Sequence, residues 1–122
     1  MNETIILRPE PEAIKSARDH VAMIAGALHF DDFLPRLIVS ELATNAWRQS
    51  APDDHIVVRA YPWREHLVIE VWDQSDKIPV IQFPGGMEEG GRGLMIISEL
   101  VVRWGTRPVA EGGKIVFAEI GK

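Results

Sequence analysis

The sequence contains no cysteine, and no apolar run approaches the ~18 residues needed to cross a bilayer. The missing cysteines exclude disulfides, thiolate metal sites and cysteine nucleophiles. The first residues, MNETIILRPEPEAIK, also lack the apolar segment of a secretory signal. We therefore expect a cytoplasmic protein that makes no contact with a membrane.

Clusters of basic residues are missing as well. The formal net charge is −5, and the lysines and arginines are scattered along the chain. The electrostatic footprint of a nucleic-acid-binding protein is therefore absent, and we expect no nucleic-acid partner. What is present is the composition of an ordinary globular protein, with 46% hydrophobic and 25% charged residues. A length of 122 residues without repeats predicts a single domain, residues 1–122.

Hydrophobic periodicity predicts the order of the helices and strands. TIILR is a short extended segment, residues 12–28 form an amphipathic helix, and a second helix starts after Asp31 or Asp32 and runs to about Ser50. HIVVRAY and HLVIEVWD alternate as two strands of an antiparallel hairpin, which PWRE connects.

The second half of the chain opens with a loop at residues 74–91, followed by a third helix, RGLMIISELV, and two closing strands, VRWGTRP and KIVFAEI. This order predicts an α+β fold, a two-layer sandwich. Its sheet is mixed but largely antiparallel, and its helices pack on one face.

Two polar residues interrupt the apolar stripe of the second predicted helix. At about 100° per residue, Glu41 and Asn45 both lie within about 20° of the direction of Leu34. An unpaired buried carboxylate or amide costs several kcal/mol, so something must solvate them. Either a buried arginine or backbone groups satisfy the pair, or the stripe borders a cavity that holds water, a metal or a ligand.

Two further features point to the same region. Asp73 continues the face of Leu67, Ile69 and Val71 by the period of two, so it points toward the helices, unless it only turns the chain at the strand end. Downstream, EEGGRGLM places glycines at a helix entrance, where free N–H groups favour an anion. Such a turn is also common as a plain flexible loop.

Taken together, ELATNAWRQS, VIEVWDQSDKIP and GGRGLMIISELVVRWGTRP with GGKIVFAEI resemble three motifs of one family. They are similar to the N box and the two glycine boxes of the Bergerat-fold, or GHKL, ATP-binding domains of gyrases, MutL and histidine kinases. The branch resembled most is that of the small stand-alone anti-sigma-factor serine protein kinases. The resemblance extends from about residue 10 to residue 120 and implies an ATP site with Mg²⁺.

The resemblance also implies a role for each matching residue. Asn45 coordinates Mg²⁺, Glu41 is the general base, and Asp73 accepts a hydrogen bond from the adenine amine. Arg48 matches a basic position that approaches phosphate, although a surface arginine is an equal reading. The turn and helix start that cradle the phosphates are Gly91, Arg92, Gly93 and Leu94.

Three positions depart from the family pattern. Ser75 and Lys77 occupy the two positions where glycine is usual after Asp73, and Ile115 stands where a threonine is usual in the last strand. By the resemblance, the first two departures alter the backbone beneath the adenine, the third removes one adenine-side hydrogen bond, and together they weaken the affinity for ATP.

The leading hypothesis is an ATP-dependent kinase that phosphorylates a serine on an anti-sigma-factor antagonist and sequesters a sigma factor. No phosphoacceptor histidine box precedes the motifs, which argues against a sensor histidine kinase. The alternative is a regulatory module that acts by partner sequestration without phosphorylation. Relatives of this branch commonly dimerise, so we also expect a homodimer, through an exposed sheet face or the first helix.

Overall fold

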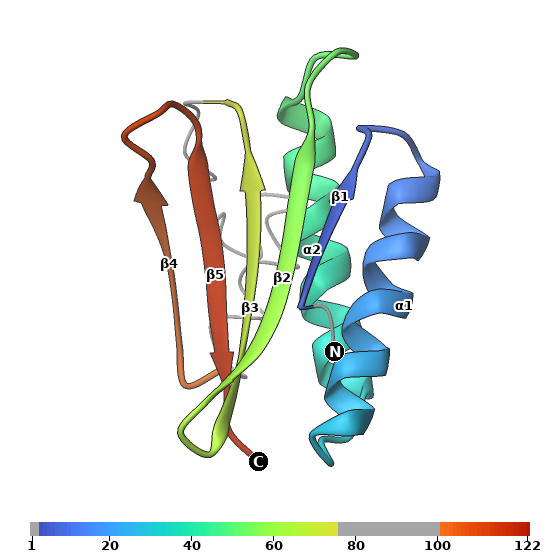
Figure 1. The fold of residues 1–122 in the computed structure, drawn as a ribbon, viewed down its shortest axis with the longest axis vertical. Helices are drawn as coiled ribbons and strands as arrows, with labels where there is room; N and C mark the ends of the chain where they lie inside the picture. Colours follow the sequence, from blue (N-terminus) through green and yellow to red (C-terminus); the bar gives the residue numbers. More distant parts are fainter. Residues whose placement is uncertain (1–2, 76–100) are drawn as a thin grey trace, which may run out of the picture.

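The computed structural model describes residues 3–75 and 101–122 of the chain. In these residues two helices pack on a five-stranded sheet of order β1-β2-β3-β5-β4 (Figure 1). Each strand pairs antiparallel with its neighbour. The expected α+β sandwich is thereby confirmed. The elements are β1 (Thr4–Leu7), α1 (Glu12–Ala27), α2 (Phe33–Gln49), β2 (Ile56–Trp63), β3 (His66–Asp73), β4 (Arg103–Pro108) and β5 (Lys114–Ile120).

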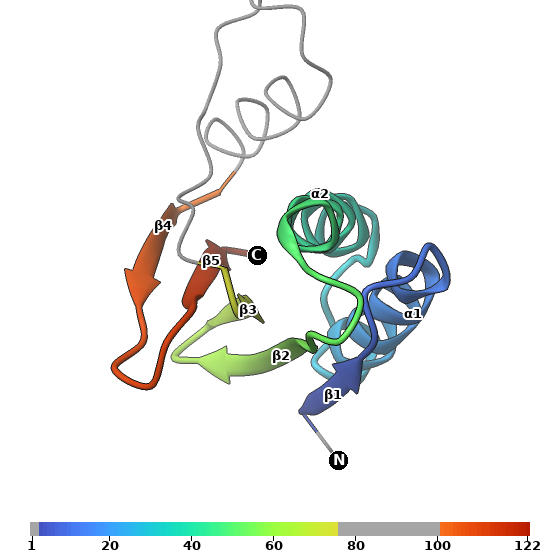
Figure 2. The ribbon, with the colours of Figure 1, turned by 90° about the horizontal axis from the view of Figure 1, so that it is seen from above.

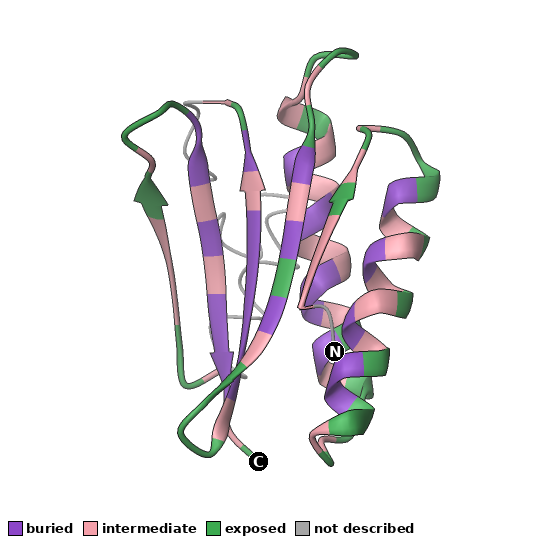
Figure 3. Ribbon diagram, in the orientation of Figure 1, coloured by how far each residue is buried: buried purple, intermediate pink, exposed green. Residues whose placement is uncertain are grey.

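Both helices cover the same face of the sheet (Figure 2). Helix α1 packs over β1 and β2, whereas α2 packs mainly over β3 and also contacts β2 and β5. Burial alternates along β2, whereas β3 is buried at five consecutive residues, and the buried residues on the helix side form one core (Figure 3). The core residues with the largest fully buried side chains are Val21, Ile24, Ile38, Val39, Leu42, Ile56, Val58, Leu67, Ile69 and Val71.

The helix boundaries lie where the sequence predicts them. Helix α1 begins directly after Pro11, with the acidic Glu12 in its first turn, and ends one residue before the predicted limit. Its exit is closed by His29 in a left-handed conformation, with a φ of 64°. Before α2, the side chain of Asp31 accepts a hydrogen bond from the backbone N–H of Phe33 at 2.9 Å.

The β2–β3 hairpin is tighter than predicted. Its turn consists of Arg64 and Glu65, while Pro62 and Trp63 belong to β2 and pair with Leu67 and His66. The prediction that PWRE is the connection was therefore wrong. Strand β1 pairs with β2 only as far as Arg59. The last hydrogen bond on this edge of β2 runs from the N–H of Ala60 to the carbonyl of Glu3. The nitrogen of Pro62 lies on the same edge, two residues further along the strand. Proline is tolerated because its missing N–H faces an open edge.

Part of the prediction lies outside the described residues. The loop beyond Ser75 and all but the last residue of the third helix, 92–101, fall between residues 76 and 100, which the structure does not describe. Neither α1 nor α2 is long and apolar enough to cross a membrane.

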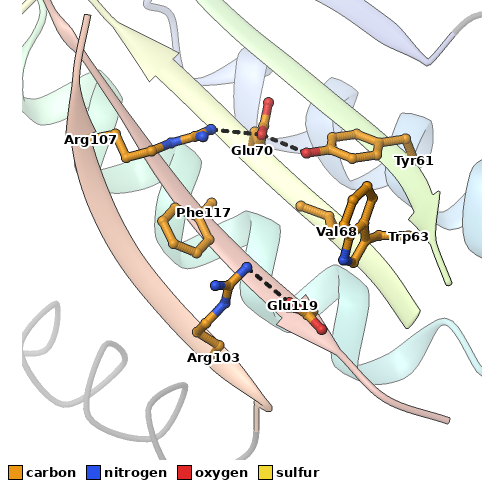
Figure 4. A pocket seen from close by; sticks show the side chains of 8 residues that line it. All are labelled: Tyr61, Trp63, Val68, Glu70, Arg103, Arg107, Phe117 and Glu119. Carbon is orange, nitrogen blue, oxygen red and sulfur yellow. Dashed lines mark hydrogen bonds and ion pairs between the residues drawn. The ribbon is translucent and has the colours of Figure 1, made fainter. Parts of the chain in front are cut away.

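The face of the sheet opposite α1 and α2 carries charged and aromatic side chains (Figure 4). Glu70 is buried there and accepts hydrogen bonds from the Tyr61 hydroxyl at 2.7 Å and from the Arg107 guanidinium at 3.0 Å. Glu119, also buried, contacts His66 Nδ1 at 2.5 Å and Arg103 at 3.2 Å. Each of the two carboxylates is thus bound by its own donors, which explains how this face tolerates buried acids.

Tyr61 gives a spectroscopic test of this network, because it is the single tyrosine in the sequence. Burial, followed by the hydrogen bond to Glu70, raises the pKa of its hydroxyl above the ordinary value of 10.0. The folded protein should therefore form tyrosinate, measured by ultraviolet absorbance, with a midpoint above that value. The contribution of the Tyr61 hydroxyl to the free energy of unfolding is fully present below pH 10 and is lost as the pH rises through the raised pKa.

Substitution Glu70→Gln separates the two causes of the Tyr61 shift. It removes the charge but leaves the burial, so the midpoint should fall only part of the way toward 10.0. Glu119→Gln alters the other acid of this face, which does not contact Tyr61, and should leave the midpoint in place. A wild-type midpoint at or below the ordinary value would contradict the assigned contacts.

Candidate functional site

The candidate site begins on α2, where Glu41 and Asn45 lie on the flank of the helix rather than at the centre of its buried face. The buried residues of α2 are Pro35, Ile38, Val39, Leu42, Ala43 and Ala46. At about 100° per residue, their mean direction lies about 90° to 130° from Glu41 and Asn45. The expectation that the pair sits inside the buried stripe was therefore wrong. The structure places it at the margin of the core.

This margin contains one buried polar atom that is not satisfied. Asn45 is half-buried, and its Nδ2 has no hydrogen-bond partner among residues 3–75 and 101–122. Glu41, one turn earlier, is also half-buried, whereas Arg48, near the end of the helix, is exposed. A buried amide without a partner is costly, so the position of Asn45 suits contact with a polar ligand.

Asp73 lies where the alternation of β3 predicts it, on the helix-facing side at the strand end. It is 1% exposed and stands directly across from Lys114, the first residue of β5. The carboxylate also accepts the backbone N–H of Ser75 at 2.8 Å, which closes the turn after the strand. Asp73 therefore both turns the chain and points into the layer between sheet and helices.

Lys114 and Gln49 connect Asp73 to α2. The Lys114 ammonium donates to the two carboxylate oxygens of Asp73 at 2.8 and 3.0 Å and to Gln49 Oε1 at 2.5 Å. Gln49 follows Asn45 by four residues, so Glu41, Asn45 and Gln49 form one row along the helix surface. The structure thereby brings Asp73 next to the row that Glu41 begins.

The backbone at the β5 entrance requires glycine. Gly113 has a φ of 81°, and a Cβ at this position would lie 2.2 Å from the backbone oxygen of Asp73. Only glycine allows so close an approach without moving one of the strands. Gly113 therefore fixes the contact between the start of β5 and the end of β3, and with it the position of Lys114 above Asp73.

Ile115 lies on the other face of the sheet. It pairs with Trp72, and both line a hollow on the open face together with Val57, Arg59 and Glu70. Ile115 therefore does not lie on the face of Asp73, where the resemblance implies the adenine-side contact, because strand residues alternate between faces. The β5 residue that stands across from Asp73, on the same face, is Lys114.

The remaining predicted site residues cannot be placed. Gly91, Arg92, Gly93 and Leu94 lie outside the described residues, as does Lys77. Sequence reasoning also missed the contribution of Gln49 and Lys114 to the site. The sequence contains a signal for each. Gln49 follows Glu41 and Asn45 at the same spacing of four residues, and Lys114 is a charged residue at the start of the apolar strand KIVFAEI.

Solved structures that resemble this chain include histidine kinase domains. A profile described as "Histidine kinase-like ATPase domain" matches residues 7–118, whereas no curated protein matches the sequence. The catalytic domain of the histidine kinase ThkA superposes with a TM-score of 0.62 at 16% identity, covering 99% of this chain and 98% of that one. The mycobacterial sensor histidine kinase MprB gives 0.58 at 18% identity, with 97% of each chain covered.

A third structure is longer than this chain. The histidine kinase domain of the blue-light activated histidine kinase EL346 from Erythrobacter litoralis gives a TM-score of 0.58 at 20% identity. The match covers 85% of this chain and 60% of that one. At such identities these likenesses show the fold alone. The profile, which spans nearly the whole sequence, shows that the chain belongs to the histidine kinase-like ATPase domain family.

Proposed function

We propose that the chain binds ATP with Mg²⁺ between α2 and the sheet and transfers the γ-phosphoryl group to a serine of a partner protein. The observation that carries this proposal is the buried Asn45 Nδ2, which has no partner within the described residues. Asn45 stands in a row with Glu41, on the margin of the core, where a ligand can reach both side chains.

Asn45 fits a magnesium–phosphate ligand through its amide. Its oxygen supplies one of the six positions around Mg²⁺, which usually takes few protein ligands and fills the rest with phosphate oxygens and water. Its Nδ2 then gains an acceptor in the same polar ligand. Bound ATP supplies the transferable phosphoryl group, and Asp73, held at the end of β3, accepts the adenine amine.

Glu41 is the proposed general base. Phosphoryl transfer demands little covalent chemistry from the protein, so positioning the serine hydroxyl and neutralising charge are the main tasks. A half-buried glutamate one turn from Asn45 is placed to accept the hydroxyl proton. The exposed Arg48 is free to turn toward phosphate, and the proposal assigns the phosphate cradle to Gly91, Arg92, Gly93 and Leu94.

The proposed protein partners follow from the branch that the motifs resemble. The phosphorylated serine belongs to an anti-sigma-factor antagonist, and the competing partner is a sigma factor. A second candidate function is that of a regulatory module, with ATP bound or with ATP binding lost, which sequesters a partner without phosphorylation. The contact between Lys114 and Asp73 favours this candidate, because it occupies the carboxylate that is assigned to adenine.

Loss of the proposed base separates the two functions. With Mg-ATP and a cognate antagonist, wild-type protein should form phosphoserine, and Glu41→Gln should lower the rate about 10²- to 10⁴-fold with ATP affinity nearly unchanged. Mass spectrometry of the antagonist and calorimetry with ATP measure the two effects. Glu65→Gln, at the exposed β2–β3 turn, is the matched control. If the two proteins associate but no phosphoserine forms, the kinase proposal is contradicted and the sequestration proposal is supported.

The open face of the sheet is the proposed dimer surface. Trp63 and Ile6 are 51% and 65% exposed on this face, although both are large and apolar. Light scattering should therefore give twice the chain mass of 13.7 kDa, and Trp63→Glu should give a monomer. Phe33→Ser, which changes an exposed aromatic at the start of α2, should leave the dimer intact. A wild-type monomer at high concentration would rule out the proposal.

A further inference from the structure

Lys114 occupies the carboxylate that the proposed function assigns to the nucleotide base. The side chains of Lys114 and Asp73 are only 3% and 2% exposed. The ammonium lies within hydrogen-bond distance of both carboxylate oxygens, at 2.8 and 3.0 Å. Asp73 Oδ1 receives a second bond from the Ser75 backbone. The structure therefore shows an internal cation in the position where the base must make its contact.

The ammonium has no donor left for a ligand. Its three N–H groups face four acceptors, namely the two oxygens of Asp73, Gln49 Oε1 and the carbonyl of Ser75 at 3.4 Å. A base that bonded to Lys114 would have to replace one of these acceptors. The cation therefore acts on the site by holding Asp73 rather than by offering a new contact.

The chemistry of the contact sets the direction of the effect. An ammonium–carboxylate hydrogen bond has charge on both partners and is stronger than a bond from a neutral amine such as that of adenine. A neutral donor that approaches Asp73 meets a carboxylate whose charge is already compensated. It gains less than it would from a free carboxylate, or it has to displace the ammonium.

We propose that Lys114 is a specificity-determining residue that competes with the nucleotide base for Asp73 and thereby lowers the affinity for ATP. This inference rests on the proposed ATP site. Binding of the base draws the Lys114 ammonium away from Asp73, and Gln49 Oε1 on α2 and the carbonyl of Ser75 remain as its acceptors. Nucleotide binding is in this way coupled to the contact between β5 and α2.

Calorimetry with Mg-ATP tests the proposal on the whole chain. Lys114→Met removes the ammonium but keeps a side chain of similar length, and it should bind ATP about tenfold more tightly, the equivalent of one charge-assisted hydrogen bond. Lys15→Met is the matched control, because it removes the same charge from an exposed pair on α1 and should leave the affinity unchanged.

Nuclear magnetic resonance of the wild-type protein gives a measurement that does not depend on the stability of a variant. The buried Lys114 ammonium should give a slowly exchanging Nζ–H signal, which shifts and exchanges faster when ATP saturates the site. A signal that ATP leaves unchanged, or equal ATP affinity in wild type and Lys114→Met, would overturn the role of Lys114 while leaving nucleotide binding intact. Absence of ATP binding in both folded proteins would overturn nucleotide binding, and the role of Lys114 with it.

Discussion

Substitution of Lys114 by methionine should lower the free energy of unfolding by about 3–5 kcal/mol. The loss is large because the carboxylate of Asp73, 1% exposed, is then left in the interior without the cation that it contacts. Its remaining bond from the Ser75 N–H does not compensate the charge. Chemical denaturation of the two proteins measures the difference, and the slope of the transition shows whether the variant still folds cooperatively.

The double substitution Asp73→Asn with Lys114→Met shows whether the cost comes from the pair. Removal of both charges leaves neither partner unpaired at this position, so the double variant should be more stable than the sum of the two single losses predicts. Lys15→Met provides the surface comparison. The Lys15–Asp19 pair is exposed, with side chains 75% and 61% accessible, and its loss should leave the stability almost unchanged. Additive effects at Asp73 and Lys114 would contradict the contact.

Replacement of Gly113 by alanine should have the second large effect. Its φ of 81° costs a residue with a side chain about 1–2 kcal/mol, and the added Cβ would lie 2.2 Å from the Asp73 backbone oxygen. Either β3 or β5 must move, so the total loss should exceed the conformational term alone. We expect a destabilisation of more than about 2 kcal/mol, measured by thermal or chemical unfolding.

Gly112 is the natural control, because it has a φ of 109° but nothing within 4 Å of an added Cβ. Gly112→Ala should therefore show only the conformational cost, and Gly113→Ala should be clearly the worse of the two. The clash should also displace Asp73, so Gly113→Ala should weaken ATP binding whereas Gly112→Ala should not. Equal effects of the two substitutions would show that the close approach to Asp73 has no energetic consequence.

The fold was largely predictable from periodicity. The strong amphipathic pattern of residues 12–28 and the alternation of HLVIEVWD predict α1 and β3 nearly to the residue. The hairpin turn was predicted less well, since Pro62 reads as a chain break in isolation. Only the pairing shows that its nitrogen faces an edge of β2 that β1 leaves uncovered. Such tertiary context is invisible to a single strand pattern.

The candidate site was predictable in part. Alternation along β3 placed Asp73 on the helix side, and its burial confirms that placement. Helical spacing put Glu41 and Asn45 on one side of α2, but it could not locate the centre of the buried face. That centre depends on where α1 and the sheet contact the helix. The half-buried Leu34, which served as the reference direction, also lies toward the margin.

Lys114 escaped prediction because its role depends on strand register. The sequence does not show which residue of KIVFAEI lies across from Asp73, and a shift by one residue moves a side chain to the opposite face. The observed register places Lys114 beside Asp73 and Ile115 beside Trp72. The residue of β5 that faces the Asp73 carboxylate is therefore the cation Lys114 rather than the apolar Ile115.

Calorimetric measurement of Mg-ATP binding to the wild type and to Asn45→Ala tests the central claim most directly. Asn45 carries the unpartnered buried amide atom of the described residues, and its removal should not disturb the core, because the residue lies at the helix margin. The account predicts saturable binding to wild type and an affinity at least about tenfold lower in the variant with magnesium present. Binding that is absent from the folded wild type, or equally strong in Asn45→Ala, would contradict the account.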